Sequence, residues 1–368
     1  MTSGLGLSHN ETVQDGDLPT VAASFGLCGD EVAVRAWGRG LIHESWTVDA
    51  PPDRVLLQRL NKKVFVDPTI MAENAAAAAV RVDRALQRAG DHEPKHRLQF
   101  LPGPDGRPWY RDRRNDVWRA SRWIDRSRPP YPDRPAELRR AAAAIGRFPG
   151  LVAGGEGPAP VVVLPGFHDT RRRVAALRES AKTDRAGRVD ECRAECERVL
   201  DLAELGERLT SIELPTRFVH NDAKLDNVLV DQTTGEGLCV VDLDTVMPGL
   251  AAHDFGDLIR SAVSGRAEDE PDLETISVRE HVFRDLAAGY LQGASGWITA
   301  AERASLVDGA IVLTFEQAAR FLADFLDGDP YFRIDDSAHN LRRARAQLRL
   351  LEELLVHESD LVSMVARL

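Results

Sequence analysis

Short apolar runs separated by turn residues occupy roughly the first third of the chain, and longer periodic stretches follow. The runs at 32–37, 45–48 and 54–60 are rich in Val, Leu and Trp, a composition that favours strands. Beyond residue 135 the apolar positions recur every three or four residues, as at Ile311, Phe315, Leu322 and Phe325, which is helical spacing. The pattern predicts an α+β protein with a sheet in its N-terminal part and a mainly helical C-terminal part.

One helix is expected among the strands of the N-terminal part. It follows Asp67 and Pro68, is rich in Ala and ends at Gly90, which are typical residues for the start and end of a helix. Three further short strands are expected after it, the last at 117–124. Later helices are expected at 136–148, 170–180, 189–209, 278–291, 301–326 and 340–354.

Composition divides the chain into three parts. Residues 1–18 are polar and aperiodic and are expected to form a loose tail. Residues 19–124 carry the strands and the Ala-rich helix, and a stretch rich in Pro and Arg opens the helical part, 125–368. With 368 residues, of which 43% are hydrophobic, the chain is long enough to form two domains.

Charge and cysteine content argue against several classes of function. The net charge of −11 would repel the phosphates of a nucleic acid, and the Arg-rich stretch at 105–134 carries little information because Arg dominates throughout. Cys192 and Cys196 lack a histidine that would complete a zinc site. We find no signal peptide and no run long enough to span a membrane, so we expect a cytoplasmic protein that binds neither nucleic acid nor membrane.

One polar loop carries the candidate chemistry. The sequence FVHNDAKLDN at 218–227 contains Asp222, Lys224 and Asn227, and VVDLD at 240–244 places Asp242 twenty residues after Asp222. This is the spacing of a phosphoryl-transfer site. The segments 227–231 and 237–242 predict two strands joined by a TTGEG turn, and this hairpin would return Asp242 to the side of Asp222.

Each of these residue types suits a part of the chemistry. Phosphoryl transfer needs positioning and charge neutralisation more than covalent work by the protein. Asp222 is expected to accept the proton of the attacking hydroxyl, and Lys224 to place a positive charge on the transferred group. Asn227 and Asp242 offer the oxygen ligands that Mg²⁺ prefers, so we predict an ATP- and Mg²⁺-dependent kinase. The alternative, an ordinary polar loop, does not account for the hairpin that follows.

A second motif nearby could be mistaken for the metal site. The sequence HDFG at 253–256 contains the letters of a kinase metal-binding motif, but it opens a predicted helix rather than ending a strand. The metal is therefore assigned to Asp242, and Asp254 is interpreted as a helix N-cap or as a brace for the catalytic loop.

The N-terminal part offers candidates for nucleotide binding. Gly38 and Gly40 leave backbone amides open to phosphates, although a plain hairpin turn explains the pattern equally well. The third strand lacks Lys, so Arg59 is the candidate cation for the α- and β-phosphates, with a solvated strand-end Arg as the alternative. Glu73, near the start of the Ala-rich helix, could pair with Arg59 or stay exposed.

These motifs resemble those of the aminoglycoside phosphotransferase and choline kinase superfamily. The H-x-D-x-K-x-x-N loop and the VDLD strand carry the match, and the Arg in VLLQRL is similar to that of choline kinases. Within the superfamily the chain most resembles bacterial N-acetylhexosamine 1-kinases, through blocks at 38–46, 57–65, 167–170, 242–249 and 320–332. The resemblance implies a bilobal protein kinase-like fold, ATP as the donor and transfer to the anomeric (C1) hydroxyl of a sugar.

The same resemblance implies residues that bind the acceptor. They are Arg320 and Tyr331, with His43 and Glu44 from an N-terminal loop. From the residues alone, Arg320 could equally form a salt bridge with Glu316 one turn earlier, and Tyr331 could cap the core. Glu44 departs from the shorter acidic or amide side chain expected there, so the acceptor could differ from an N-acetylhexosamine.

Alternatives to a sugar kinase stay open. The Arg-heavy composition suggests a GC-rich genome, in which relatives often serve secondary metabolism, so a cyclitol or pseudo-sugar acceptor is the nearest alternative. Aminoglycoside or choline-type acceptors would require an acidic pocket. A pseudokinase or regulatory binding module would usually have lost the base or a metal ligand, whereas Asp222, Asn227 and Asp242 are all present.

Overall fold

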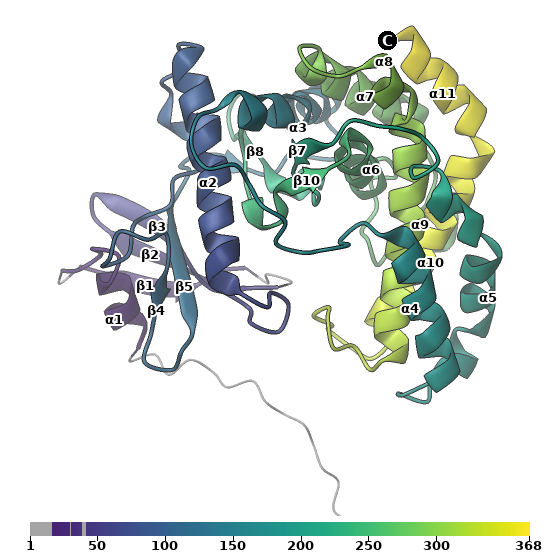
Figure 1. The fold of residues 1–368 in the computed structure, drawn as a ribbon, viewed down its shortest axis with the longest axis horizontal. Helices are drawn as coiled ribbons and strands as arrows, with labels where there is room; N and C mark the ends of the chain where they lie inside the picture. Colours follow the sequence, from purple (N-terminus) through teal and green to yellow (C-terminus); the bar gives the residue numbers. More distant parts are fainter. Residues whose placement is uncertain (1–16, 30, 39–41) are drawn as a thin grey trace, which may run out of the picture. The chain divides into compact units, whose positions relative to one another are not determined.

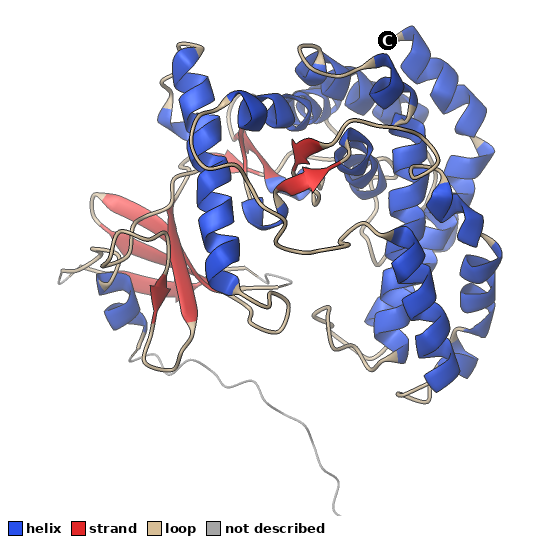
Figure 2. Ribbon diagram, viewed as in Figure 1, coloured by secondary structure: helices blue, strands red, loops and turns tan. Residues whose placement is uncertain are grey.

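The computed structural model describes residues 17–29, 31–38 and 42–368, and the chain divides into two compact units. The first, the sheet unit, holds the residues up to Leu60 together with Phe100–Trp123. The second, the helical unit, holds Asn61–Gln99 and Ile124–Leu368. Gly40 and nearly all of the predicted tail lie outside the described residues. Figure 1 labels most helices and strands of each unit, and Figure 2 shows their secondary structure.

The sheet unit is built on a five-stranded antiparallel sheet in the order β1-β2-β3-β5-β4. Val55 and Leu57 lie two positions apart on β3, so they share one face of the sheet, and both are fully buried, as are Trp118 and Ala120 of β5. The short helix α1 (Leu18–Ala23) shares a hydrophobic cluster with these residues. The strands are β1 (Ala33–Ala36), β2 (Glu44–Ala50), β3 (Asp53–Arg59), β4 (Tyr110–Arg111) and β5 (Val117–Arg122).

The long helix α2 (Pro68–Arg88) begins where its sequence signals predict. Asp67 accepts hydrogen bonds from the first free N–H groups of the helix, at 2.9 and 3.3 Å. The sequence division placed this helix in 19–124, but in the structure it belongs to the helical unit. Asn74 provides a physical reason, because its side chain donates to the carbonyl of Val246 and accepts from the N–H of Val161, both at 2.6 Å.

The core of the helical unit forms around two closely packed helices, α3 (Pro135–Gly154) and α7 (Glu280–Ala294). A Cβ atom at Gly146 would lie 2.1 Å from the carbonyl oxygen of Tyr290, so only glycine permits this approach. Helices α6 (Ala251–Ala262), α9 (Leu306–Leu326) and α10 (His339–Val356) complete the same core. Its fully buried rings include Phe255, Phe283, Tyr290, Phe315, Phe321 and Phe325.

Short strands in the helical unit position the candidate catalytic loop. Strand β7 (Arg217–Val219) pairs antiparallel with β10 (Met247–Gly249), and β8 (Val228–Asp231) lies between β6 (Ser127–Arg128) and β9 (Gly237–Val240). The β8–β9 hairpin was predicted, but β9 ends at Val240 rather than at Asp242. Asp242 has a φ of +62° and directly precedes the 3₁₀ turn η5 (Leu243–Thr245).

Two predicted helices differ from the structure. The single helix predicted at 189–209 is wrong: the segment contains η2 (Val189–Glu191), α5 (Arg193–Asp201) and η3 (Ala203–Glu207). The helix predicted at 301–326 is divided at Ser305, whose hydroxyl donates to the carbonyl of Glu302 at 2.8 Å. The remaining elements are α4 (Thr170–Thr183), α8 (Ala300–Ala304), α11 (Glu358–Arg367), η1 (Pro94–His96), η4 (Leu225–Asn227) and η6 (Leu273–Thr275).

Two features concern membrane-spanning helices and metal-binding clusters in the described part of the chain. Among these residues, no helix has the length and apolar character needed to cross a membrane. The Sγ atoms of Cys192 and Cys196 lie 3.7 Å apart, and the described part of the chain contains no group of three or more His, Cys, Asp or Glu residues that could hold a metal ion.

Candidate active site

The loop between β7 and β8 brings three of the predicted residues together. The carboxylate of Asp222 lies 3.1 Å from Nζ of Lys224, and it accepts a hydrogen bond of 3.2 Å from Nδ2 of Asn227. The same amide nitrogen donates to the backbone carbonyl of Asp222 at 2.7 Å. Asp222, Lys224 and Asn227 therefore form one hydrogen-bonded group.

Asp222 and Lys224 stabilise each other's charged form. Burial by itself raises the pKa of Asp222, but the charges of Lys224 and His220 outweigh burial, and the pKa lies below its usual value. Burial likewise opposes the charged form of Lys224, but Asp222 and Asp257 raise its pKa above the usual value. Both side chains are 26% exposed. Asp222 is therefore ionised at neutral pH and open to a proton donor.

Asp254 holds the backbone of this loop. It lies in the first turn of α6, is fully buried, and accepts hydrogen bonds from the N–H groups of His220 at 2.9 Å and Asn221 at 2.7 Å. Of the two roles predicted for Asp254, the structure shows the brace, because the N-cap position is Leu250. Burial raises the pKa of Asp254 to about 6, although the charge of His220 and the two N–H groups favour the carboxylate.

His220 and Asn221 fasten the loop to the segment around Asp242. Asn221 has a φ of +63°, which Asn tolerates better than most residues, and its Nδ2 donates to the carbonyl of Thr245 at 3.0 Å. Nε2 of His220 lies 2.9 Å from the carbonyl oxygen of Val241, and the hydroxyl of Thr245 donates to the carbonyl of His220 at 2.8 Å. The two segments are thus joined by hydrogen bonds in both directions.

Asn227 and Asp242 fit the predicted Mg²⁺ ion. The N–H of Val241 donates to the carbonyl of Asn227 at 2.9 Å, so Asp242 follows a residue that is bonded directly to Asn227. The amide nitrogen of Asn227 is engaged by Asp222, which leaves its amide oxygen as the available ligand atom. The exposed Asp242 adds a carboxylate, and both oxygen types are ones that Mg²⁺ takes.

A buried charged network lies near Lys224 and was not predicted. Nε of Arg260 lies 2.5 Å from Asp257, and its Nη1 lies 2.7 Å from Glu268. Asp257 and Glu268 both raise the pKa of Lys224, although Asp222 acts on it more strongly. The available sequence signal was the spacing of Asp257 and Arg260, one helical turn apart on α6.

Arg320 lies among aromatic rings and forms no salt bridge with another residue that the structure describes. Its guanidinium carbon is 5.2 Å from the ring centroid of Phe167, 5.7 Å from that of Tyr331 and 5.4 Å from that of Phe332. Its Nη1 donates to the side-chain oxygen of Gln317 at 2.9 Å. Arg320 and these three rings are called the arginine–aromatic cluster below.

Glu316, the alternative partner predicted for Arg320, binds other residues. Its carboxylate lies 2.9 Å from Nδ1 of His168 and accepts a hydrogen bond of 2.7 Å from the hydroxyl of Thr170. Burial by itself raises the pKa of Glu316, but His168 outweighs it and Arg320 adds to the effect, so the pKa is about 2. Nε2 of His168 lies 2.9 Å from the carbonyl oxygen of Asn221. His168 therefore links α9 to the catalytic loop, a contact that the sequence did not reveal.

Asp324 fixes the turn that carries two of the aromatic rings. One carboxylate oxygen accepts from the N–H of Tyr331 at 2.9 Å, and the other accepts from the N–H of Phe332 at 3.0 Å and from Nδ2 of Asn340 at 2.9 Å. Gly328 has a φ of +87°, which lets the chain turn after α9. Sequence reasoning passed over Asp324, although it lies within the 320–332 block.

In the sheet unit, two residues with different predicted roles contact each other. Arg59 forms an ion pair with Glu44, its partner in the β2–β3 ladder, and its Nη1 lies 3.4 Å from Asp116. His43 is buried, with 8% of its surface exposed. The roles of Arg59 in nucleotide binding, and of His43 and Glu44 in acceptor binding, stay predictions.

The remaining N-terminal candidates are Gly38, Gly40 and Glu73. Gly38 is exposed and has a φ of +66°, a conformation that favours glycine. Gly40 lies outside the described residues. Glu73 lies in the second turn of α2, and its pairing with Arg59 stays a prediction.

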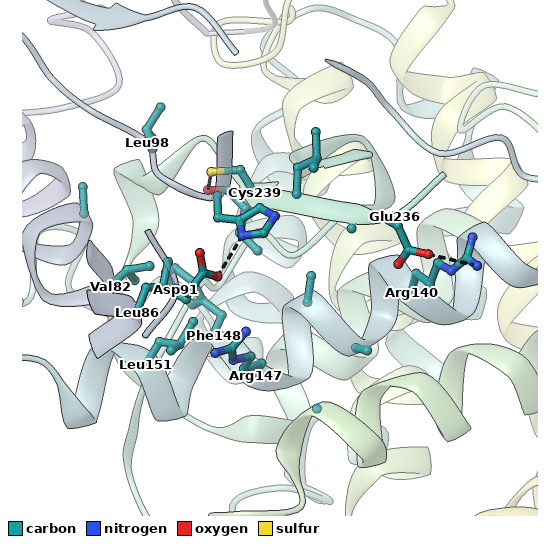
Figure 3. A pocket seen from close by; sticks show the side chains of 18 of the residues that line it. Val82, Leu86, Asp91, Leu98, Arg140, Arg147, Phe148, Leu151, Glu236 and Cys239 are labelled. Atoms are coloured by element: carbon teal, nitrogen blue, oxygen red, sulfur yellow. Dashed lines mark hydrogen bonds and ion pairs between the residues drawn. The ribbon is translucent and has the colours of Figure 1, made fainter. Parts of the chain in front are cut away.

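A cavity of about 550 Å³ lies between α2, α3 and β9 (Figure 3). Leu86, Phe148 and Cys239 line it, and Arg140 and Glu236 form an ion pair of 3.1 Å at its wall. Among the described residues that line it, none was predicted to act in catalysis or binding. The ring of Phe148 lies 5.7 Å from that of His220, so the cavity adjoins a residue that supports the catalytic loop.

A second cavity, of about 570 Å³, lies directly beside the catalytic loop. Its lining includes Asn221, Phe167, His168 and His253. Burial lowers the pKa of His253 to about 3, with a further contribution from His168, whose ring lies 4.6 Å away. His253 is therefore neutral at physiological pH.

Similar structures support the architecture. A spectinomycin phosphotransferase, solved with ADP and spectinomycin, is 12% identical, with a TM-score of 0.56 over 94% of this chain and 99% of that one. A choline/ethanolamine kinase family protein from Mesorhizobium loti is 19% identical, with a TM-score of 0.57 over 95% and 98%. A microcompartment-associated aminopropanol kinase is 14% identical, with a TM-score of 0.57 over 95% and 98%. At such identities the likeness shows the fold alone, and the predicted protein kinase-like fold is confirmed.

The sequence itself matches a family profile. The profile of the phosphotransferase enzyme family (APH) covers residues 52–304, more than half of the chain, including the catalytic loop and Asp242. The similar structures are those of small-molecule kinases, while the closer resemblance to N-acetylhexosamine 1-kinases stays a prediction. The chain belongs to the phosphotransferase enzyme family.

Proposed function

We propose that this phosphotransferase is an ATP- and Mg²⁺-dependent kinase that acts on a hydroxyl of a sugar or sugar-like acceptor, most simply the anomeric (C1) hydroxyl. The observation that carries the proposal is the state of Asp222, which is ionised, partly exposed, ion-paired with Lys224 and bonded to Asn227. The buried Asp254 holds the two preceding backbone N–H groups. A carboxylate fixed in this way is suited to orient a hydroxyl and accept its proton.

In this proposal Asp222 is the general base. The acceptor oxygen forms a bond to the γ-phosphorus while the bond between that phosphorus and the bridging oxygen of ADP breaks, and the hydroxyl proton passes to the carboxylate of Asp222. Lys224 keeps Asp222 ionised, and its ammonium also offers a positive charge to the transferred phosphoryl group. The same pair therefore prepares the base and neutralises charge.

Asn227 and Asp242 would hold Mg²⁺ through an amide oxygen and a carboxylate. When bound, the ion neutralises negative charge on the phosphate oxygens. The use of a nucleotide is supported by the spectinomycin phosphotransferase, which has been solved with ADP and with AMP. Arg59, with Gly38 and Gly40, is assigned to the triphosphate, and Glu73 to the support of Arg59.

The acceptor is assigned to Arg320 and Tyr331, with His43 and Glu44. Support for this assignment comes from within the helical unit, where His168 connects the residue beside Asp222 to the helix that carries Arg320. The aromatic rings around Arg320 offer flat apolar surfaces of the kind on which a sugar ring packs.

The test is ADP release with MgATP and a panel of N-acetylhexosamines, hexoses, cyclitols, aminoglycosides and choline. We expect turnover of sugars or cyclitols, and Asp222→Asn should lower kcat by about 10²- to 10⁴-fold, the usual contribution of a general base. Asp226→Asn is the matched control, because Asp226 is an exposed aspartate of the same loop. Full activity of Asp222→Asn would exclude the proposed base. If the wild type binds ATP but releases no ADP with any acceptor of the panel, a regulatory binding module would be favoured.

A further inference from the structure

Arg173, on α4, is a cation that has no ionic partner among the described residues. Its Nη2 donates to the carbonyl of Phe167 at 2.7 Å, whereas its Nε is buried and has no hydrogen-bond partner. Within the part of the chain that the structure describes, Arg173 forms no ion pair. A guanidinium has five N–H donors, and a buried donor without an acceptor is unfavourable. Arg173 is thus poised to bind an acceptor atom that the described residues do not supply.

Arg320 lies close enough to Arg173 to repel it. Burial is the largest cause that lowers the pKa of Arg173, and the charge of Arg320 is the next. The two guanidiniums also share a neighbour, since Arg173 bonds the backbone of Phe167 and Arg320 lies 5.2 Å from its ring. The one hydrogen bond of Arg320 goes to the neutral Gln317, and Arg320 has no ion pair with any described residue. Neither of these two adjacent cations is therefore bonded to a counter-ion from the part of the chain that the structure describes.

The carboxylates nearby are engaged by other groups. Glu316 is bound by His168 and Thr170, and it acts on both guanidiniums only at a distance, as one negative charge against two positive ones. Asp324 accepts three hydrogen bonds from the turn after α9 and from Asn340. Arg173 and Arg320 thus bring two positive charges, against which Glu316 sets one negative charge, and this balance favours an anion.

This positive region is connected to the catalytic loop. His168 follows Phe167 in the chain, and its Nε2 lies 2.9 Å from the carbonyl oxygen of Asn221, the residue before Asp222. Every residue in this connection belongs to the helical unit, so the relation does not depend on the position of the sheet unit.

We infer that the acceptor of this kinase carries an anionic group, a carboxylate or a phosphate, which Arg173 and Arg320 bind together. The inference rests on the proposed function, because it takes Arg320 to lie in the acceptor site. Guanidinium groups bind carboxylates and phosphates through paired N–H donors, and the bound anion would also relieve the repulsion between the two cations. The expected acceptors are a uronic acid or a sugar or cyclitol phosphate with a free hydroxyl.

Matched acceptors that differ in charge test this inference. D-Glucose, D-glucuronate and D-glucose 6-phosphate form one set, and N-acetylglucosamine with its 6-phosphate forms another; every member keeps its anomeric hydroxyl. We expect kcat/KM from ADP release to be at least about tenfold higher for an anionic member than for its neutral counterpart, the size of a hydrogen-bonded charge contact.

The variant Arg173→Met should reduce that preference about 10- to 100-fold, mainly through KM, and Arg173→Lys should restore part of it because it keeps the charge without the paired donors. Arg178→Met is the matched control, since Arg178 is an exposed arginine on the same helix. The control should leave the preference and the melting temperature unchanged. If Arg173→Met does not fold, the comparison of wild type with Arg173→Lys carries the test.

Calorimetric binding of glucose 6-phosphate without nucleotide separates this inference from the proposed kinase activity. Binding to the wild type that weakens at least tenfold in Arg173→Met, without phosphorylation of any acceptor, would support the anion site and contradict the kinase. If neutral acceptors are turned over as well as anionic ones, and if the ratio of their kcat/KM values is unchanged in Arg173→Met, the inference is overturned. The proposed kinase activity would then still stand.

Discussion

The catalytic loop and the arginine–aromatic cluster differ in how their polar groups are satisfied. In the loop, Asp222, Asn227 and the backbone of His220 and Asn221 are held by hydrogen bonds of 2.7 to 3.2 Å. In the cluster, Arg320 is held mainly by rings at 5.2 to 5.7 Å and by one neutral side chain. The polar groups of the loop bond largely to one another, whereas Arg320 in the cluster uses few of its N–H donors in hydrogen bonds to described residues.

This difference indicates that the two regions have different roles, one in catalysis and one in binding. A base must keep one position and one charge during the reaction, which a saturated network provides. A binding site instead needs donors that a ligand can satisfy. His168 and Glu316, which are 148 positions apart, connect the two regions, so a change in one can reach the other. The following substitutions test how separate the regions are.

The largest effect on stability and on kcat is expected from Asp254→Ala, which removes the side chain that holds the backbone of the catalytic loop. The substitution leaves two buried N–H groups without an acceptor, each at a cost of about 1–3 kcal/mol, so the free energy of unfolding should fall by about 2–6 kcal/mol. The kcat should fall as well, because the backbone before Asp222 loses its support. Urea denaturation and ADP release measure the two effects, with Asp226→Ala as the exposed control. A loss below 1 kcal/mol would contradict the role as a brace.

Glu316→Gln removes a charge from the connection between the two regions. Its effect on the free energy of unfolding should depend on pH. The pKa of Glu316 is about 2 in the folded protein and 4.5 ordinarily. Because the folded pKa is the lower one, the carboxylate contributes stability above pH 4.5, about 3 kcal/mol, which is lost as the pH falls from 4.5 towards 2. Gln does not titrate. The difference in the free energy of unfolding between wild type and variant should therefore be smaller at pH 3 than at pH 5. A difference that is unchanged at pH 3 would argue against an ionised Glu316.

Asp324→Asn changes the arginine–aromatic cluster and leaves the catalytic loop as it is. An amide keeps one oxygen but loses the other as an acceptor, so the turn that carries Tyr331 and Phe332 should loosen, and the protein should lose about 2 kcal/mol of stability. If the cluster serves binding, the KM for the acceptor should rise several-fold while kcat stays within about twofold, since truncating a binding contact changes KM first. A fall in kcat as large as that of Asp254→Ala would break the division proposed between the regions.

The smallest effect is expected from Tyr331→Leu. It removes one cation–π contact of Arg320, about 0.5–1 kcal/mol, which corresponds to a two- to fivefold rise in the KM for the acceptor. Tyr331→Phe keeps the ring and is the control. If Tyr331→Phe has the larger effect, the hydroxyl rather than the ring contacts the acceptor.

Local signals were enough for much of the fold and for the catalytic loop. Asp67 and Gly90 limit α2 because caps act within one helical turn. Asp222, Lys224 and Asn227 fall within six consecutive positions, and a short hairpin returns the chain to Asp242, so their convergence follows from the predicted strands. The same reasoning failed at 189–209, where the apolar spacing stays helical although the chain forms three separate helical segments. There Cys192 leaves the helical conformation and Gly206 packs tightly against Thr170.

The sequence by itself therefore predicted the reaction class, since most of the residues proposed to carry it lie close together in the chain. Only the tertiary structure decided which residues surround Arg320. The spacing of Glu316 and Arg320 permits a salt bridge but does not require one, and Glu316 instead binds His168, 148 positions away. Arg173 could not be singled out among so many arginines, because its lack of a counter-ion within the described residues depends on segments far away in the sequence. Contacts between distant segments are set by packing, which no local pattern encodes.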